Sequence, residues 1–175
     1  SQLDFPDIGK DNIISYFNAG SIAAFDAKTD KLSTLEIDYP VKTQKIVDLK
    51  QYNNRYYLAD AVNGQIYRFS KSGSKLTGAA SWLNGSEDLT NATGIDIDGS
   101  VYLLKNNGEV SKYSKGKKQE FFVSAIEPNF SQAAKLTISD NLDFLYIFEP
   151  IAKRLVVFNK NGNFINQYTS DNFDI

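Results

Sequence analysis

An aromatic residue recurs along the chain at a nearly constant interval, each time just before a turn. The four residues are Phe25, Phe69, Tyr113 and Phe158, so the spacings are 44, 44 and 45 residues. A period of this length is typical of repeat proteins, in which each repeat is one supersecondary unit that stacks on its neighbours. The 175 residues therefore predict a single domain over residues 1–175, with repeats at approximately 1–40, 41–86, 87–128 and 129–175.

Each repeat predicts a meander of antiparallel strands. An apolar strand that carries an aligned tyrosine (Tyr16, Tyr57, Tyr102 or Tyr146) precedes each recurring aromatic residue, over Ile13–Phe17, Arg55–Ala59, Ser100–Leu104 and Phe144–Phe148. Turn signals such as Asn63-Gly64 and Asn107-Gly108 follow these strands, and Asn-Gly strongly favours a hairpin. A more polar, outer strand is predicted at the end of each repeat, over Ser33–Ile37, Gly78–Trp82, Glu120–Ser124 and Phe164–Tyr168.

Short apolar segments ahead of three of the hairpins predict an innermost strand. They are Ile46–Leu49, Gly94–Ile97 and Lys135–Ile138. In the first repeat this strand comes either from Leu3–Ile8, where Pro6 cannot donate to a ladder, or from Phe173–Ile175. Both arrangements are compatible with the pattern.

Strands such as Arg55–Ala59 and Phe144–Phe148 are almost continuously apolar, which indicates that both of their faces are buried. Radial stacking of four-stranded sheets buries both faces in this way. The predicted fold class is therefore all-β, a β-propeller built from four four-stranded antiparallel blades. The ring is either closed with four blades or is part or half of a larger propeller, and a homodimer through open blade edges is one way to complete it.

Two stretches resemble the NHL-like and related six- to eight-bladed propeller families. In the third repeat the pattern is Gly94-Ile-Asp-Ile-Asp-Gly-Ser-Val-Tyr-Leu103 followed by Gly108-Glu-Val-Ser-Lys-Tyr113, and the fourth repeat shows it again from Leu142 to Phe164. The resemblance implies a propeller architecture. It is not specific for function, because such propellers serve as binding platforms, as structural domains and as enzymes.

Composition excludes several kinds of chemistry. The chain has no histidine and no cysteine, so catalysis by a Ser-His-Asp or Cys-His arrangement and zinc binding by these residues are excluded. The net charge of −2 and the dispersed lysines and arginines predict no nucleic-acid partner. Apolar runs are too short for a membrane span, so we expect no membrane insertion. A chain without thiols fits oxidising and reducing compartments alike, which leaves the localisation open.

The loops between successive blades supply the candidate binding residues. Leu83–Ala92 and Glu127–Ala133 are longer than hairpin turns, and long loops on rigid scaffolds often carry binding sites. Residues in or before the first loop and at equivalent strand ends near the same face form the candidate ligand-binding set: Trp82, Asn84, Glu87, Asp60, Lys105 and Glu149. The alternative is that these loops are plain crossovers, that Trp82 is a packed edge residue and that the charged residues are merely solvated.

Asp48 and Asp96 lie on predicted innermost strands, where carboxylates lining a channel would suit a hard cation such as Ca²⁺. Thr137 takes the corresponding place in the fourth repeat, so the ring of ligands is incomplete. We therefore expect no cofactor, with Ca²⁺ as the alternative.

The predicted function is a non-catalytic binding or scaffold module that recognises a protein, peptide or glycan on the loop face, and not an enzyme. One alternative is a cation-dependent propeller lyase or hydrolase that uses the channel carboxylates. A second is a purely structural or assembly domain of a larger protein.

Overall fold

The computed structural model describes residues 4–8, 12–17, 21–42 and 44–173, and these residues form an all-β protein. They contain sixteen strands and no helix, and hence no helix long and apolar enough to cross a membrane. The chain divides into two compact units, Ser1–Ser86 and Glu87–Ile175, named unit 1 and unit 2 here. The single domain over residues 1–175 remains a prediction.

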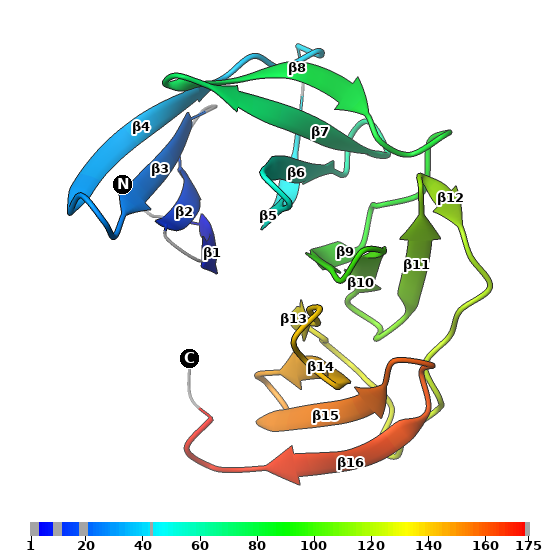
Figure 1. The fold of residues 1–175 in the computed structure, drawn as a ribbon. Coiled ribbons are helices and arrows are strands. Elements are labelled where there is room, and N and C mark those ends of the chain that lie inside the picture. The colour runs from blue at the N-terminus through cyan, green and yellow to red at the C-terminus, as the bar shows by residue number, and fades with distance from the viewer. Residues whose placement is uncertain (1–3, 9–11, 18–20, 43, 174–175) are drawn as a thin grey trace. The chain divides into compact units, whose positions relative to one another are not determined.

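Unit 1 contains eight strands in two successive antiparallel meanders. Meander 1 consists of β1 (Asp4–Ile8), β2 (Asn12–Phe17), β3 (Ser21–Asp26) and β4 (Lys31–Ile37), and meander 2 consists of β5 (Ile46–Tyr52), β6 (Arg55–Asp60), β7 (Gln65–Ser72) and β8 (Lys75–Ser81). A short parallel pairing of β4 with β8 joins them into one eight-stranded sheet of order β1-β2-β3-β4-β8-β7-β6-β5 (Figure 1).

Unit 2 contains two separate four-stranded sheets. Meander 3 consists of β9 (Ala92–Ile97), β10 (Val101–Lys105), β11 (Val110–Ser114) and β12 (Lys117–Lys118), and meander 4 consists of β13 (Lys135–Thr137), β14 (Phe144–Glu149), β15 (Arg154–Asn159) and β16 (Phe164–Thr169). All neighbouring strands within these sheets are antiparallel.

The predicted hairpins are confirmed. The recurring aromatic residues lie opposite equivalent residues of the preceding strand, as Phe69 opposite Tyr56, Tyr113 opposite Val101 and Phe158 opposite Leu145 show. The hairpin glycine Gly64 has a φ of 57°, a backbone conformation that glycine adopts without steric cost.

Register places one predicted residue differently. In meander 1, Phe25 lies opposite Ile13, so Ile14, and not Tyr16, corresponds to Tyr57, Tyr102 and Tyr146. The predicted alignment of Tyr16 is therefore wrong. Tyr16 was aligned with the other tyrosines because it is also a tyrosine. The pairing of strands across the hairpin shows instead that Ile14 is the equivalent residue.

The innermost strand of meander 1 comes from the N-terminal segment. Strand β1 pairs with β2, and its register shifts between Asp4 and Asp7, the interval that contains Pro6. An irregularity of this kind accommodates a residue that cannot donate to the ladder. Of the alternative segment, Phe173 packs its ring edge-on against Phe148, and Asp174 and Ile175 lie outside the described residues.

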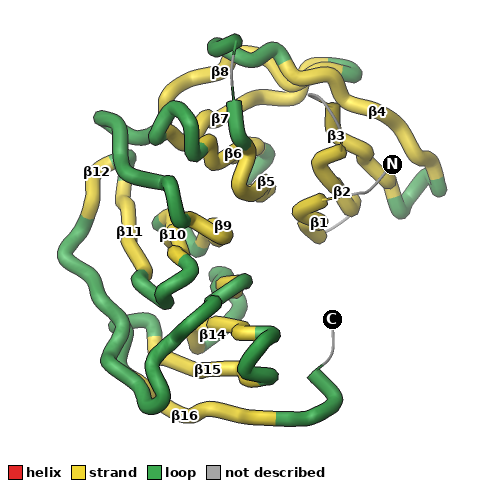
Figure 2. Tube along the Cα trace, turned by 180° about the vertical axis from the view of Figure 1, so that it is seen from behind, coloured by secondary structure: helices red, strands yellow, loops and turns green. Residues whose placement is uncertain are grey.

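The predicted outer strand Glu120–Ser124 is wrong, because meander 3 ends in the two-residue strand β12 instead. The long loop that follows β12 (Figure 2) runs to meander 4, where Ser124 donates its backbone N–H to the carbonyl of Gly162 at 2.8 Å. The short segment Ser131–Ala134 within this loop, which has a helix-like sequence, is not helical.

Each unit has its own apolar core between its two meanders. In unit 1, Ile14 and Ile22 of meander 1 pack in one cluster with Leu58 and Phe69 of meander 2. In unit 2, Tyr102 and Val110 of meander 3 share a cluster with Leu145, Ile147 and Phe158 of meander 4. Faces of two successive meanders thus meet in each unit.

Candidate functional site

Three of the predicted binding residues end the second strand of their meanders and face residues at or just before the start of the next strand. The pairs are Asp60 with Gln65, Lys105 with Glu109, and Glu149 with Arg154. Each pair closes a hairpin. Their contacts show what these polar groups do in the fold.

Glu149 and Arg154 form a fully hydrogen-bonded ion pair inside unit 2. Arg154 Nε donates to Glu149 Oε2 at 2.7 Å, and the two side chains are 3% and 0% exposed. Glu149 Oε1 accepts bonds from the backbone N–H groups of Ser131 and Gln132, and the guanidinium donates to the carbonyls of Pro128 and Asn129. The pair therefore fastens the loop between β12 and β13 to the hairpin of meander 4.

The pKa of Glu149 reflects these contacts. Burial raises the pKa of the carboxyl, whereas the hydrogen bonds from Gln132, Ser131 and Arg154 lower it, and the net pKa lies below its usual range. The carboxylate thus remains ionised although no water reaches it.

Asp60 and Gln65 have the same task in unit 1. The buried carboxylate of Asp60 accepts from the backbone N–H of Lys45 at 3.0 Å and from Asn63 Nδ2 at 2.7 Å. Gln65 is also buried, and its amide oxygen accepts from the backbone N–H of Leu83 at 2.8 Å. These side chains hold the loops that enter and leave meander 2.

Lys105 and Glu109 form the corresponding pair in meander 3, and this pair is more exposed to solvent. Their ammonium and carboxylate lie 3.5 Å apart, with side chains 20% and 47% exposed. Ligand binding by Asp60, Lys105 and Glu149 stays a prediction, and all three already have partners within the fold.

The other predicted loop residues are divided between the two units. In unit 1, Trp82 is half-buried and stacks edge-on against Tyr57 at 6.1 Å, whereas Asn84 is exposed. In unit 2, Glu87 lies 3.9 Å from the Lys118 ammonium. Burial and the nearby Glu87 carboxylate together raise the pKa of Tyr113 to about 12. Ligand binding by Trp82, Asn84 and Glu87 stays a prediction.

Pairing between strands shows which residues of the innermost strands are equivalent to Asp96, and Asp48 is not one of them. Asp96 lies opposite Tyr102, Lys50 opposite Tyr57, and Asp7 opposite Ile14, so Asp7 and Lys50, and not Asp48, correspond to Asp96. Sequence spacing missed this because Asp7 follows the register shift in β1.

Asp7 and Asp96 make the same contact in the two units. Asp7 Oδ2 accepts from the backbone N–H of Gln51 at 2.7 Å, and Asp96 Oδ2 accepts from that of Ile138 at 2.9 Å. The Asp7 carboxylate thereby ties β1 to β5, and the Asp96 carboxylate ties β9 to the residue that follows β13. Asp48 accepts from the backbone N–H of Leu49. In the described part of the chain, no group of three acidic side chains is arranged to hold a metal ion.

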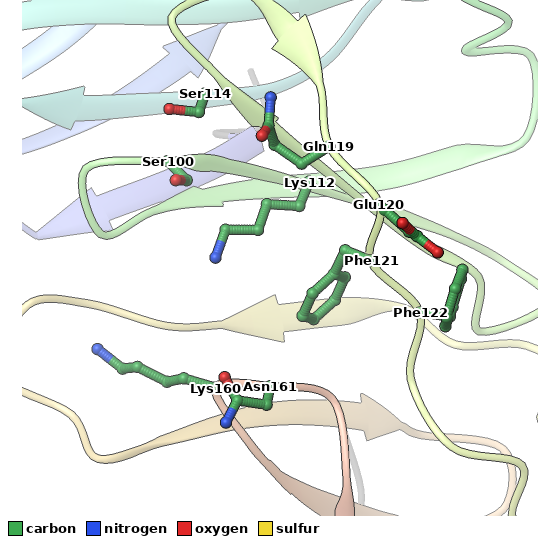
Figure 3. Close-up of a pocket in the computed structure, with 9 residues that line it drawn as sticks. All are labelled: Ser100, Lys112, Ser114, Gln119, Glu120, Phe121, Phe122, Lys160 and Asn161. Carbon is green, nitrogen blue, oxygen red and sulfur yellow. The ribbon is translucent and has the colours of Figure 1, made fainter.

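A pocket of about 470 Å³ opens between meanders 3 and 4 of unit 2, at the end of the sheets where β9 turns into β10 and β15 into β16 (Figure 3). Its lining combines ammonium, aromatic, amide, hydroxyl and carboxylate groups: Ser100, Lys112, Ser114, Gln119, Glu120, Phe121, Phe122, Lys160 and Asn161. None of these residues was predicted as a binding residue.

The two lysines of this pocket have different partners. Lys160 donates to the carbonyl of Ser139 at 2.8 Å and lies 3.4 Å from the Asp98 carboxylate, so its charge is balanced. Lys112 Nζ lies 5.0 Å from the ring centre of Tyr102 and 5.6 Å from that of Phe121. Among the described residues no carboxylate forms an ion pair with Lys112. The pocket therefore contains an ammonium held by aromatic rings and free to meet an anion.

Sequence reasoning missed this site because its residues come from three separate segments. The adjacent Phe121 and Phe122, which follow three lysines within Lys115–Lys118, were the one local signal. The prediction of an outer strand over the same residues obscured it.

A second groove, of about 780 Å³, lies in unit 1. Amide and tyrosine side chains line it together with charged groups: Asn12, Asp26, Lys28, Gln51, Tyr52, Asn53, Asn54, Arg55, Tyr56 and Lys71. Lys71 follows Phe69 by two residues, as Lys160 follows Phe158, and Asn12 and Ser100 likewise occupy equivalent positions in the register. The two grooves therefore take corresponding places between the meanders of their units.

No protein-family model matches the chain, and no curated protein matches it. Solved structures do. They include the computationally designed protein Ika8 (TM-score 0.56, 14% identity, 96% of this chain and 62% of that one) and a luciferin-regenerating enzyme (TM-score 0.60, 12% identity, 95% and 59%). A catalytically inactive virginiamycin B lyase from Staphylococcus aureus with quinupristin also matches (TM-score 0.58, 17% identity, 97% and 57%).

These likenesses show the fold alone. The chain has a propeller-like, all-β fold, in keeping with the first part of the sequence prediction. It spans about three fifths of the length of the structures that it matches. The NHL-like resemblance stays a prediction.

Proposed function

We propose that the four meanders are blades of a propeller that acts as a non-catalytic binding module, and that unit 2 recognises an acidic segment of a protein or peptide in the Lys112 pocket. The observation that carries the proposal is the position of Lys112 Nζ above Tyr102 and Phe121 at the pocket surface. The aromatic rings stabilise and orient the ammonium, and a carboxylate that enters the pocket adds an ion pair without displacing an internal partner.

The aromatic side chains beside Lys112 support a protein or peptide ligand. Phe122 is 71% exposed, and Phe121 is partly buried against the core of unit 2. An exposed aromatic side chain beside a cation is typical of residues that dominate the energy of protein interfaces. A ligand with an acidic and an apolar residue close together fits both groups.

The fold supports the pocket rather than the long loops as the binding surface. The carboxylates of Glu149 and Asp60 already accept hydrogen bonds from backbone N–H groups of the loops. If a ligand drew these carboxylates away, the N–H groups would lose their acceptors. No contact of this kind depends on the side chains of Lys112 and Phe122. Binding at the pocket leaves these loop contacts in place.

Fluorescence anisotropy with a labelled hexaglutamate peptide tests the proposal, with hexaglutamine as the uncharged probe. We expect hexaglutamate to bind and hexaglutamine to bind much more weakly. Lys112→Gln should weaken hexaglutamate binding by about 5- to 30-fold, the loss expected for one charge-assisted contact of about 1–2 kcal/mol. A peptide that carries a phenylalanine beside its glutamates tests the aromatic contact separately. We expect Phe122→Ala to weaken the binding of that peptide.

The matched control is Lys42→Gln, which removes one charge from an exposed lysine of unit 1. If Lys42→Gln weakens binding as much as Lys112→Gln does, the peptide responds to overall charge and the pocket is not its site. Absence of hexaglutamate binding by the wild-type protein would remove the proposal altogether.

The groove of unit 1 favours a glycan as the second candidate ligand. Four carboxamides (Asn12, Gln51, Asn53 and Asn54) and two tyrosines line it, and amide hydrogen bonds beside aromatic rings suit sugar hydroxyls and ring faces. Titration with neutral oligosaccharides tests this candidate. Binding that Asn12→Ala abolishes and Lys112→Gln leaves unchanged would assign a glycan to unit 1.

A further inference from the structure

Asparagine is followed directly by glycine at four places in the chain: Asn63, Asn84, Asn107 and Asn161. In this dipeptide the backbone nitrogen of the glycine can attack the side-chain carbonyl carbon of the asparagine, because glycine has no Cβ to obstruct the approach. The product is a cyclic imide, which water opens to aspartate or isoaspartate. A pair reacts only where its backbone is free to bring the two atoms together, so the structure distinguishes the four.

The glycines that follow Asn107 and Asn161 are held in closed hairpin turns. The first donates its backbone N–H to the carbonyl of Lys105 at 2.9 Å, and the second donates to the carbonyl of Asn159 at 2.9 Å. Both glycines are buried. A nitrogen whose proton is bound in a turn is a poor nucleophile, and the turn must open before the imide can close. These two pairs are therefore protected.

At Asn63 the asparagine side chain itself is fixed. Its Nδ2 donates to Asp60 Oδ2 at 2.7 Å, and the following Gly64 is buried. The Asp60 carboxylate also accepts from the backbone N–H groups of Lys45 and Val62, so the acceptor is held in place as well. The Asn63 carboxamide would have to give up its bond to a buried carboxylate before its carbon reached the Gly64 nitrogen.

The pair Asn84-Gly85 has none of these restraints. Both residues are exposed, in the loop that follows β8. Over the residues that the structure describes, neither the Asn84 carboxamide nor the Gly85 N–H has a hydrogen-bond partner. Nothing lies within 4 Å of the Cβ position of Gly85. The Gly85 nitrogen therefore lies in open space, where rotation of the backbone brings it to the side chain of Asn84.

We propose that Asn84 is a site of spontaneous deamidation, which converts it to isoaspartate and aspartate while the other Asn-Gly pairs persist. The Gly85 nitrogen forms a bond to Asn84 Cγ, the Cγ–Nδ2 bond breaks, and the proton of the Gly85 N–H leaves with the ammonia. Water then cleaves one of the two C–N bonds of the imide. Cleavage at Cγ gives aspartate, and cleavage at the main-chain carbonyl carbon gives isoaspartate. The inference goes beyond the proposed function, because the reaction needs only water and no ligand.

Isoaspartate at this position should loosen the loop that leaves meander 2. Gln65 Nε2 donates to the carbonyls of Leu83 and Gly85 at 3.3 and 3.4 Å, and Gln65 Oε1 accepts from the backbone N–H of Leu83 at 2.8 Å. Isoaspartate inserts a methylene into the main chain between these two carbonyls. One buried side-chain amide then no longer reaches both, so the loop loses part of its attachment to β7.

Peptide mapping by mass spectrometry, on protein stored at body temperature in mildly alkaline buffer, tests the proposal. Conversion replaces an amino group by a hydroxyl group, and chromatography separates the isoaspartyl from the aspartyl peptide. We expect Asn84 to convert at least about tenfold faster than Asn107 and Asn161, the ratio for turns that must open at a cost of about 1.4 kcal/mol. In concentrated urea, which removes the turns, the four pairs should convert at similar rates.

Two variants separate the steps. Gly85→Ala should fold normally, because its Cβ would lie in open space and the φ of Gly85 is outside the left-handed region, yet the added methyl group hinders closure of the imide and should slow conversion several-fold. Asn84→Asp adds the charge of the product without lengthening the main chain. Hydrogen exchange of the Leu83 amide should therefore quicken in the converted wild type and stay slow in Asn84→Asp.

Three outcomes would overturn the proposal. Conversion of Asn107 or Asn161 in the folded protein as fast as that of Asn84 would mean that the turns give no protection. An Asn84 that stays unmodified after prolonged storage would remove the site itself. An unchanged rate in Gly85→Ala would show that ammonia is lost by direct hydrolysis and not through the imide, so that no isoaspartate forms.

Discussion

Arg154 donates through Nε to Glu149 at 2.7 Å, across the closed end of the hairpin between β14 and β15, and both side chains are buried. The guanidinium also lies 5.1 Å from the ring centre of Phe130. Further hydrogen bonds of the pair run to the loop between β12 and β13 and to Gln167 of β16. The pair thus connects this loop, the hairpin and β16.

Removal of one partner should therefore cost more than removal of both. Glu149→Ala leaves the Arg154 charge buried and unpaired, and we expect it to lower the free energy of unfolding by about 3–5 kcal/mol. The double change Glu149→Leu with Arg154→Leu should cost less than the single change, because it leaves no buried charge. Urea denaturation followed by circular dichroism measures both. A double variant that is less stable than Glu149→Ala would contradict this prediction.

The lowered pKa of Glu149 predicts acid sensitivity. Since the folded state holds this carboxyl more firmly ionised than the unfolded chain does, its contribution to stability is present above 4.5, the ordinary pKa of a glutamate side chain, and is lost as the pH falls through the lower folded pKa. We expect the stability of Glu149→Gln to change less steeply with pH below about 4.5 than that of the wild type. Melting midpoints between pH 3 and pH 6 decide this, and parallel curves for the two proteins would argue against it.

The contact from Asp96 to the backbone of Ile138 should stabilise unit 2. Asp96→Ala removes an acceptor from that N–H group, and we expect a loss of about 1–3 kcal/mol. Asp7→Ala should have a comparable effect on unit 1, because Asp7 accepts from Gln51 in the same way. Hydrogen exchange of the Ile138 and Gln51 amides resolves the two effects, with each variant expected to increase exchange in its own unit. Loss of protection in the other unit alone would refute the assignment.

Gly162 should not tolerate a side chain. Its φ is 88°, and a Cβ would lie 2.1 Å from the backbone oxygen of Phe122. Gly73 has a φ of 57°, but nothing lies within 4 Å of its Cβ position, so it reports the cost of the backbone conformation alone. We expect Gly162→Ala to lower the melting midpoint clearly more than Gly73→Ala. Equal shifts would mean that the loop after β12 moves freely away from the turn.

Calcium should not stabilise the protein. The Asp96 carboxylate accepts bonds from two backbone N–H groups and that of Asp48 from one, and a cation would have to compete with these donors. We expect equal melting midpoints in calcium chloride and in chelator. A cation site filled to a hundred times its dissociation constant would stabilise the fold by about 2.7 kcal/mol, so a clear rise of the midpoint in calcium would instead favour the cation-dependent enzyme.

The hairpins could be predicted from sequence because their signals are local. Asn63-Gly64 and the residues around Phe69 lie within a few positions of the bonds that they form, and the structure confirms the turn and both strands. The predicted strand over Glu120–Ser124 failed because its fate depends on a distant partner. Ser124 bonds to Gly162, 38 residues away, and no local pattern encodes that contact.

The candidate site was beyond sequence reasoning for a related reason. Lys112 belongs to β11, Phe121 to the loop after β12, and Lys160 to the turn before β16. The equivalence of Asp7 and Asp96 was also missed. The register shift in β1 changes the residue of β2 that Asp7 faces, and sequence spacing does not show this shift. Charged strand ends, in contrast, were found correctly, but their internal hydrogen bonds appear only in three dimensions.

The core of unit 1 draws on residues between Ile14 and Leu76, and that of unit 2 on residues between Tyr102 and Phe158. During synthesis the first cluster is complete before the ribosome has made any residue of the second. The carboxylate of Asp7 also meets its partner at Gln51 within that first half. Vectorial synthesis therefore delivers a self-contained apolar cluster early, which shortens the time for which its strands remain exposed to other nascent chains.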